Sequence, residues 1–488
     1  MNDCPEGSFL DYKWTALSVT TVGAVLSSIQ SSALLIALPS MMKELDLNFF
    51  YALWIILIYM LLTVVLVPTI GKLADSLGRK KLYNLGFAIF GAGSLLAGMA
   101  GGKGATAGNE LVLFRAIQAV GGSLLMVNST AIVADAFKKG EVGLGLGVNQ
   151  IAFIVGFTVG PVVGGLLTAI SWRLVFFFNI PIALFALPWA YLRLREVVEP
   201  SKEAGFDYAG NALIAAALTA LLLGLTFVAF PGIPLAYIGG LLVSSFILFA
   251  LFFRVETSAK YPIMDLSLFH DAGFSYANAA NLLSGIATGA VTFLLIFFLQ
   301  GPYGQTPLSA GIMMIPYGLA FLALGPLSGR LSDLYGSRSL SMAGMAVSSA
   351  GLLMLATITR GTPYPVLASY MVVMGAGSGL FSSPNTNAIM SSVSPMRRGM
   401  ASGIRAMLRN TGSMLSLAVT FPFLISRVTV NQLMEIMLYG GGVHGSSFNL
   451  IGFEAGLHAA FLFSMAMSVA AVAFSAMMPP ARQQSAEQ

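Results

Sequence analysis

Long apolar runs follow one another along the whole chain, and they constrain its fold more than any other feature. A helix that crosses a lipid bilayer needs about 20 mostly apolar residues. No run alternates with a period of two, so a β-barrel is excluded. The pattern therefore predicts an all-α polytopic membrane protein with fourteen transmembrane helices, at about 15–38, 50–70, 84–102, 111–134, 144–169, 174–193, 208–230, 235–253, 275–299, 309–328, 340–358, 364–390, 402–424 and 457–478.

The composition agrees with a surface that faces lipid. The 488 residues are 57% hydrophobic and 9% charged, whereas a soluble protein has about 25% charged residues. The net charge of +5 does not indicate nucleic acid, because the basic residues lie in small groups between the apolar runs. Cys4 is the single cysteine, so no disulfide framework exists.

The distribution of Lys and Arg predicts the orientation. They are concentrated in loops that an inside N-terminus would leave in the cytoplasm, such as Arg79, Lys80 and Lys81, whereas few lie in the opposite loops. The N-terminus lacks a basic stretch and a cleavage site, so the first span is expected to be retained. We expect a multi-pass protein of the cell membrane with both termini in the cytoplasm.

The sequence also repeats itself. "GKLADSLGRKK" begins at Gly71 and "GRLSDLYGSRS" at Gly329, an offset of 258 residues (329 − 71). The same offset carries the first span onto the ninth and the fifth onto the thirteenth. We predict two six-helix halves, residues 1–200 and 258–488, with two inserted helices in residues 201–257. Duplicated halves around a central path are typical of transporters.

The repeated motif lies between the second and third spans, on the predicted cytoplasmic side. Its glycines allow a tight turn and close helix contact. An acidic side chain here can face a helix N-terminus and pair with a nearby Arg in one state and not in another. An ordinary basic loop is the alternative, but it would not explain the second copy. We predict a conformational latch formed by Gly71, Asp75, Gly78, Arg79 and Asp333.

Small residues mark the fifth span, which reads "GFTVGPVVGG" from Gly156. Small residues at helical spacing let two helices pack backbone to backbone, and Pro161 removes one helical hydrogen bond. Generic small-residue packing is the alternative, but the combined pattern is more specific. Its members are Gly156, Gly160, Pro161, Gly164 and Gly165.

Two polar side chains stand in the fourth span. Arg115 lies near its outer end, and Gln118 follows about one turn later on the same face. A charge inside a membrane normally has a partner in the bundle, so we expect both residues in the central cavity. The alternative is an Arg that extends to the outer interface.

The sequence lacks the usual signals of an enzyme. No His, Cys, Asp or Glu cluster has metal-ligand spacing, and neither a phosphate-binding GxxxxGK loop nor a GxSxG nucleophile motif is present. We therefore expect no metal, no cofactor and no catalytic residue.

These motifs resemble those of the major facilitator superfamily, and specifically of its fourteen-helix drug:proton antiporter branch. The repeated loop is similar to motif A, "LVLFRAIQ" to motif B, and "GFTVGPVVGG" to the antiporter motif C. "SWRLVFFFNIP" resembles the branch signature, with Trp172, Arg173, Asn179 and Pro181, and "LRNTGSMLS", which contains Arg409, resembles the thirteenth span.

The resemblance implies a major-facilitator fold and a secondary active efflux transporter of the multidrug type. It implies proton antiport by alternating access. The expected partners are a lipophilic small-molecule substrate, protons and membrane lipid, with no nucleic acid, and the expected state is a monomer.

Gln30 departs from the family pattern. The first span of the family ends in a motif like L-D-x-T-x-x-N-x-A-L-P, and counting back nine residues from Pro39 places Gln30 where the Asp stands. A carboxyl group in a partly dry cavity has a raised pKa and can exchange a proton near neutrality, but Gln cannot ionise. Smaller departures are Ala119 in motif B and the lone Arg338 in the second motif A.

Two readings of Gln30 are open. In the first, Gln30 only forms a packing hydrogen bond to a neighbouring helix. In the second, it is a neutral mimic of a protonated Asp. We favour the second because polar residues inside membranes are usually functional. No carboxylate lies near the middle of any predicted span. We therefore assign proton coupling or the substrate cavity to Gln30, Arg115 and Gln118.

The substrate can be predicted only by class. The 34 Phe, 15 Tyr and 25 Met residues suit lipophilic compounds, and the scarcity of buried carboxylates argues against multivalent cations. A long outer loop, residues 425–456, is expected to cover the exit. The alternatives are a lipid or metabolite exporter of the same fold and a non-transporting sensor.

Overall fold

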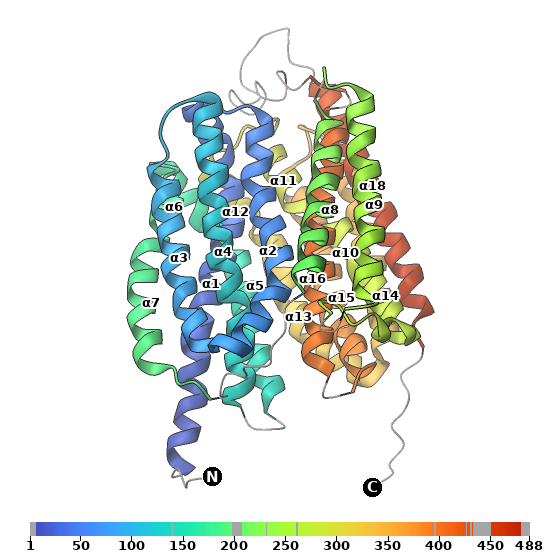
Figure 1. Ribbon diagram of the computed structural model, residues 1–488. Helices are drawn as coiled ribbons and strands as arrows, with labels where there is room; N and C mark the ends of the chain where they lie inside the picture. The colour runs from blue at the N-terminus through green and yellow to red at the C-terminus, as the bar shows by residue number, and fades with distance from the viewer. Residues whose placement is uncertain are drawn as a thin grey trace. The chain divides into compact units, whose positions relative to one another are not determined.

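The computed structural model describes residues 6–137, 141–197, 207–230, 232–259, 262–394, 397–425, 427–429, 432 and 450–479 (Figure 1). These residues form helices joined by short connections, and no strand occurs among them. The predicted all-α class is therefore confirmed. By its internal contacts the chain divides into unit 1, Met1–Phe206 with Thr306–Ile312, and unit 2, Asp207–Gln305 with Met313–Gln488.

Unit 1 contains the helices of the first six predicted spans. They are α1 (Glu6–Leu45), α2 (Phe49–Leu77), α3 (Arg79–Met99), α4 (Gly104–Ala136), α5 (Val142–Ile170), and the pair α6 (Leu174–Phe177) and α7 (Asn179–Arg193). The short helix α12 (Pro307–Met313) contributes Pro307–Ile312 to this unit.

Unit 2 contains the remaining helices. They are α8 (Tyr208–Phe227), α9 (Leu235–Glu256), η1 (Leu266–His270), α10 (Ala272–Thr288), α11 (Val291–Gln300), α13 (Ile315–Tyr335), α14 (Ser337–Leu355), α15 (Tyr364–Ser391), α16 (Arg398–Ile425) and α18 (Leu450–Met477). The two predicted inserted helices are α8 and α9, which pack on each other. The predicted three-part division at residues 200 and 257 stays a prediction.

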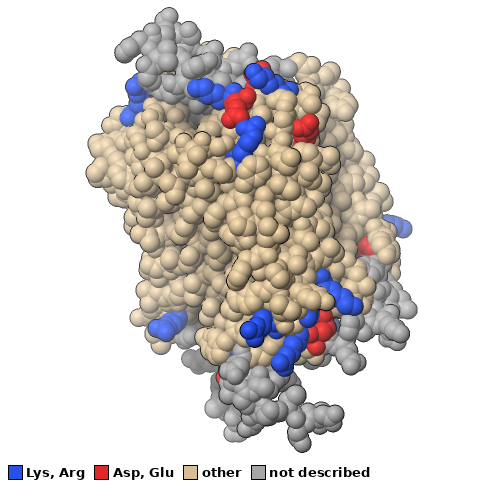
Figure 2. All heavy atoms as spheres, turned by 90° about the vertical axis from the view of Figure 1, so that its left-hand side faces the viewer, with Lys and Arg blue, Asp and Glu red and all other residues tan. Residues whose placement is uncertain are grey.

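Thirteen helices in the described part of the chain are long and apolar enough to cross a membrane. The remaining predicted span, the thirteenth at 402–424, is the 28-residue helix α16. Arg398, Arg405 and Arg409 lower the hydropathy of its first half. On the face drawn in Figure 2, most charged side chains lie toward the two ends, and the wide area between them is uncharged except at its right-hand edge. The chain is therefore a multi-pass membrane protein.

The internal repeat is visible in the backbone. Gly78 between α2 and α3 has φ 98°, and Gly336 between α13 and α14 has φ 80°. The two are 258 residues apart (336 − 78), and a positive φ favours glycine at both turns.

Helix packing repeats in the same way. In unit 1, α1 packs on α5 and α7, and α4 packs on α1, α2 and α3. In unit 2, α10 packs on α16 and α18, and α15 packs on α10, α13 and α14. Each unit thus contains one copy of the same six-span arrangement.

Candidate functional site

Gln30 lies in the interior of unit 1, on the face of α1 that meets α7. Its side chain is 1% exposed, and its Oε1 accepts a hydrogen bond of 2.5 Å from Nδ2 of Asn179. Asn179 is fully buried and begins α7. Gln30 therefore connects two helices, and its hydrogen-bond partner is another neutral amide.

Arg115 points into unit 1 and is 2% exposed. It lies 11 residues after Gly104, the first residue of α4 (115 − 104), which is roughly three helical turns. Its Nε donates to the carbonyl of Ile55 at 3.1 Å, and Nη1 donates to Oε1 of Gln118. The guanidinium also lies 4.3 Å from the centroid of the Tyr59 ring, a cation–π contact. These contacts hold the guanidinium inside the bundle.

Ser94 of α3 joins the Arg115–Gln118 pair to the Asn179–Gln30 pair. Nε2 of Gln118 donates to its Oγ at 2.6 Å, and Nδ2 of Asn179 approaches the same oxygen at 3.3 Å. We call the resulting series Arg115, Gln118, Ser94, Asn179 and Gln30 the buried polar chain. It connects α4, α3, α7 and α1, so the three residues expected in the central cavity form one network.

The buried polar chain contains a cation and no anion. Arg115 forms no ion pair with any described residue. Two buried atoms of the chain also lack a hydrogen-bond partner, Nε2 of Gln30 and Oδ1 of Asn179. Unpartnered polar atoms in a protein interior are costly, so this network has spare capacity to bind a ligand group.

The motif C glycines place α5 directly against the part of α1 that carries Gln30. A Cβ on Gly164 would lie 2.7 Å from the Cα and carbonyl oxygen of Ala33, and a Cβ on Gly156 would lie 2.9 Å from the carbonyl of Val25. Gly160 faces Ser32 of the same helix, and Gly165 faces Pro307 of α12. Pro161 lies in α5 and its carbonyl faces Gly311.

The branch-signature residues occupy the turn between α5 and α6 and the start of α7. Trp172 is 2% exposed and donates from Nε1 to Oε2 of Glu44 at 2.8 Å. Arg173 forms an ion pair with the same carboxylate and stacks on the Trp172 ring at 4.4 Å. Pro181 lies exposed in the first turn of α7, where a missing N–H is tolerated.

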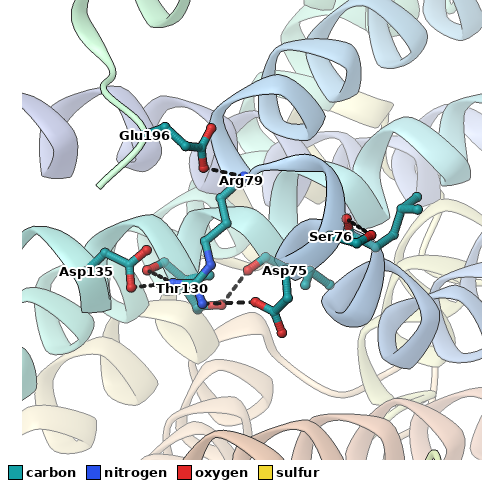
Figure 3. A network of polar contacts seen from close by, with 9 residues as sticks. Asp75, Ser76, Arg79, Thr130, Asp135 and Glu196 are labelled. Atoms are coloured by element: carbon teal, nitrogen blue, oxygen red, sulfur yellow. Dashed lines mark hydrogen bonds and ion pairs between the residues drawn. The ribbon is translucent and has the colours of Figure 1, made fainter. Parts of the chain in front are cut away.

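Motif A forms a charged cluster at the α2–α3 turn (Figure 3). Arg79 pairs with Asp75 at 3.0 Å and also with Asp135 of α4. Glu196 accepts hydrogen bonds from the backbone N–H groups of Arg79 and Lys80, at 2.6 and 3.2 Å. The predicted Asp75–Arg79 pair is present, but the carboxylate at the α3 N-terminus is that of Glu196.

Motif A glycines differ in their surroundings. Gly78 is buried with φ 98°, and a Cβ there would meet the Glu196 carboxylate. A Cβ added at Gly71, on α2, would lie 4.0 Å from the side chain of Val127 on α4, which is an ordinary van der Waals contact. Gly78 is therefore the glycine that the turn requires.

The second motif A and the outer loop are only partly described. Asp333 lies in α13, but its side chain falls outside the described part of the structure. Most of the outer loop 425–456, predicted to cover the exit, also falls outside it. Arg409 lies in α16 and donates to Ser284 and Thr288 of α10 at 2.6 and 3.2 Å.

Sequence reasoning missed Ser94, Glu44 and Glu196. Ser94 is one small polar residue in a span rich in Gly and Ala, and such residues are common in packed helices. Glu44 and Glu196 lie at the end of α1 and just after α7, so their partners come from distant parts of the chain. No group of three or more potential metal ligands occurs among the described residues.

Comparisons with known proteins agree with this architecture. The sequence profile of the Major Facilitator Superfamily matches residues 20–277 and 277–487. The riboflavin transporter RibZ of Clostridioides difficile is 31% identical over 421 residues, which cover 86% of this chain and 90% of that protein. The multidrug resistance protein Stp of Mycobacterium tuberculosis is 30% identical over 414 residues, which cover 83% of this chain and 74% of that protein.

Solved structures show the same fold. A bacterial homologue of the human lysosomal transporter Spinster aligns with a TM-score of 0.66 at 16% identity, over 96% of this chain and 97% of that one. The nucleoside transporter NupG aligns with a TM-score of 0.61 at 14% identity, over 95% of this chain and 98% of that one. Together with the profile match, these similarities show that the chain belongs to the Major Facilitator Superfamily and is a membrane transporter rather than an enzyme.

Proposed function

We propose that this protein is a secondary active efflux transporter of lipophilic small molecules that works by alternating access of its two six-helix halves. The buried polar chain of unit 1 carries this proposal. A connected series of polar side chains with two unpartnered atoms is costly in an apolar bundle, and binding a ligand would offset that cost. We assign the protein to the fourteen-helix branch and to the cell membrane, as a monomer with both termini in the cytoplasm.

The family's mechanism in this branch is proton antiport, and Gln30 occupies the position of the coupling carboxyl group. The amide of Gln30 has nearly the shape of a protonated carboxyl group. Asn179 donates to Gln30 Oε1, as it could donate to the carbonyl oxygen of a protonated acid. The protein with Gln30 would bind substrate but would not exchange it for protons, since the ionised state of the cycle is missing.

The test compares the protein with its Gln30→Asp variant in proteoliposomes under an imposed pH gradient. We expect gradient-driven flux of a lipophilic dye only in the Asp variant. Substrate affinity should be nearly independent of pH between about 5 and 8 with Gln30 and pH-dependent with Asp. Strong gradient-driven flux with Gln30 would contradict the assignment and direct attention to Glu454, Asp135 or His458.

A second candidate is a metabolite transporter, which the 31% identical riboflavin transporter favours. Counterflow in proteoliposomes preloaded with unlabelled compound needs no proton gradient, so it separates substrate choice from coupling. Exchange of labelled riboflavin without exchange of the dye would favour the metabolite transporter. Absence of any exchange would favour a non-transporting sensor.

A further inference from the structure

Unit 2 carries two arginines on one face of α16, one helical turn apart. Arg409 donates to the hydroxyl groups of Ser284 and Thr288 on α10. The backbone carbonyl of Arg405 accepts from Asn281 of the same helix at 2.8 Å. Asn281, Ser284 and Thr288 follow helical spacing, so α10 presents a polar face to the arginine pair.

This pair has no negative charge to balance it. Arg405 and Arg409 form no ion pair with any described residue. The Nε atom of Arg405 is shielded from solvent and has no hydrogen-bond partner. Like charges at i and i+4 on a helix destabilise each other, and hydroxyl groups accept hydrogen bonds without supplying charge. The pair therefore lacks an anion.

Basic residues also lie deeper than acidic residues in the membrane-crossing helices of both units. Arg115 and Arg409 each lie 11 residues inside their helices (115 − 104; 409 − 398), and Arg405 lies 7 residues inside α16 (405 − 398). Every Asp and Glu of the described membrane-crossing helices lies within six residues of a helix end (Glu110 is the deepest, 110 − 104). Charged groups within a membrane usually pair with one another. In these inner parts of the described helices the charged side chains are all cations.

The position of the pair points to a transported compound rather than to a lipid headgroup. Arg409 lies 11 residues after Arg398, the first residue of α16 (409 − 398). Counted from residue 402, where the predicted span begins, Arg409 lies 7 residues (409 − 402) or about 10 Å along the helix, roughly a third of the hydrocarbon thickness of a bilayer. Lipid headgroups lie at the two surfaces of that layer.

We propose that Arg405 and Arg409 form an anion-binding site in unit 2, and that the substrate is a lipophilic compound with a carboxylate group. A planar carboxylate matches the fork of a guanidinium, and its oxygens would accept from the unpartnered Nε of Arg405. This inference rests on the proposed transport function for the identity of the ligand. The site itself can be tested without transport.

The experiment is isothermal titration of the purified full-length protein in detergent. The probes are 1-naphthoate, biphenyl-4-carboxylate and decanoate, each paired with its neutral amide. We expect at least one carboxylate to bind roughly tenfold or more tightly than its amide, because hydrogen bonds to charged groups are the stronger ones. In an Arg405→Gln/Arg409→Gln variant this preference should fall to near unity.

Two further variants keep the test informative. Arg409→Lys retains the charge but loses the guanidinium fork, so it should keep part of the preference for carboxylate over amide. This variant tests the site even if the double variant does not fold. Arg254→Gln removes an exposed arginine at the end of α9 in the same unit and should leave the preference unchanged.

The outcomes separate the sources of the anion. If phosphatidylglycerol in the micelles abolishes the preference for carboxylates, a lipid headgroup occupies the site and the substrate assignment is wrong. If no carboxylate binds better than its amide, or if the double variant keeps the preference, the site itself is wrong. Counterflow exchange of neutral or cationic compounds would survive either result, whereas failure of the proposed transport function would leave the binding of carboxylates intact.

Discussion

Nδ2 of Asn179 donates a 2.5 Å hydrogen bond to Oε1 of Gln30, across the contact between α7 and α1. Both residues are buried, and both come from segments that resemble signatures of one transporter branch. The contact joins Gln30, which we propose stands at the coupling position, to Asn179, 149 positions later in the chain. Unit 1 therefore places these two signature elements in direct contact.

This contact predicts a specific non-additivity. Asn179→Leu alone leaves the Gln30 carbonyl oxygen buried without a donor and should lower the free energy of unfolding by about 1–3 kcal/mol. Gln30→Leu/Asn179→Leu removes both partners, so the double variant should be less destabilised than the sum of the two single variants. Reversible unfolding in detergent micelles, followed by Trp fluorescence, measures all three. Strictly additive effects would show that the bond contributes nothing.

Arg115 should be essential for transport. Arg115→Ala removes two hydrogen bonds and the cation–π contact with Tyr59, so we expect counterflow exchange of substrate, which needs no proton gradient, to be abolished. Arg115→Lys should restore it only in part, because an ammonium group lacks the guanidinium fork. The control is Leu113→Ala, which changes an exposed side chain of the same helix. Full counterflow exchange by the Lys variant would reduce the role of Arg115 to a point charge.

The α1–α5 contact should be intolerant of added volume. Gly164→Ala would place a Cβ 2.7 Å from the backbone of Ala33, so the helices must separate and both the melting temperature and transport should fall. Gly147→Ala on the same helix meets no atom within 4 Å. It should leave transport unchanged and add up to about 1 kcal/mol of stability through helix propensity. Equal melting temperatures for the two variants would contradict this packing.

The motif A cluster should depend more on Asp135 than on Asp75. Both carboxylates pair with Arg79, but the side chain of Asp135 is 16% exposed and that of Asp75 is 54% exposed. Exposed ion pairs contribute little, so Asp135→Asn should lower transport and stability more than Asp75→Asn. We still expect Asp75→Asn to lower transport at near-normal expression if the pair is a state-dependent latch.

The control for the motif A variants is Lys81→Gln, an exposed residue of the same motif with no described partner. The rate of counterflow exchange per transporter and the melting temperature should be measured together. Wild-type transport in both Asn variants would remove the latch from this mechanism.

The sequence by itself determined the helix count, the repeat and the family motifs. Apolar length is a local property, so spans such as 174–193 and 208–230 could be placed to within a few residues of α6–α7 and α8. The helices extend further where the chain leaves the apolar layer, as α2 does through Leu77. Polar residues end an apolar run without ending a helix. The helix α2 ends only at Gly78, where φ is positive.

Tertiary structure decided which polar side chains meet. The pattern around Arg115 and Gln118 indicated a shared helix face, but Ser94 joins them to Asn179 and Gln30 only because α3, α4, α7 and α1 pack together. Likewise, Glu196 reaches the α3 N-terminus from 117 residues away. A single span fixes the face on which a polar residue lies. Its hydrogen-bond partners lie on other spans, and only the packed bundle brings them within hydrogen-bonding distance.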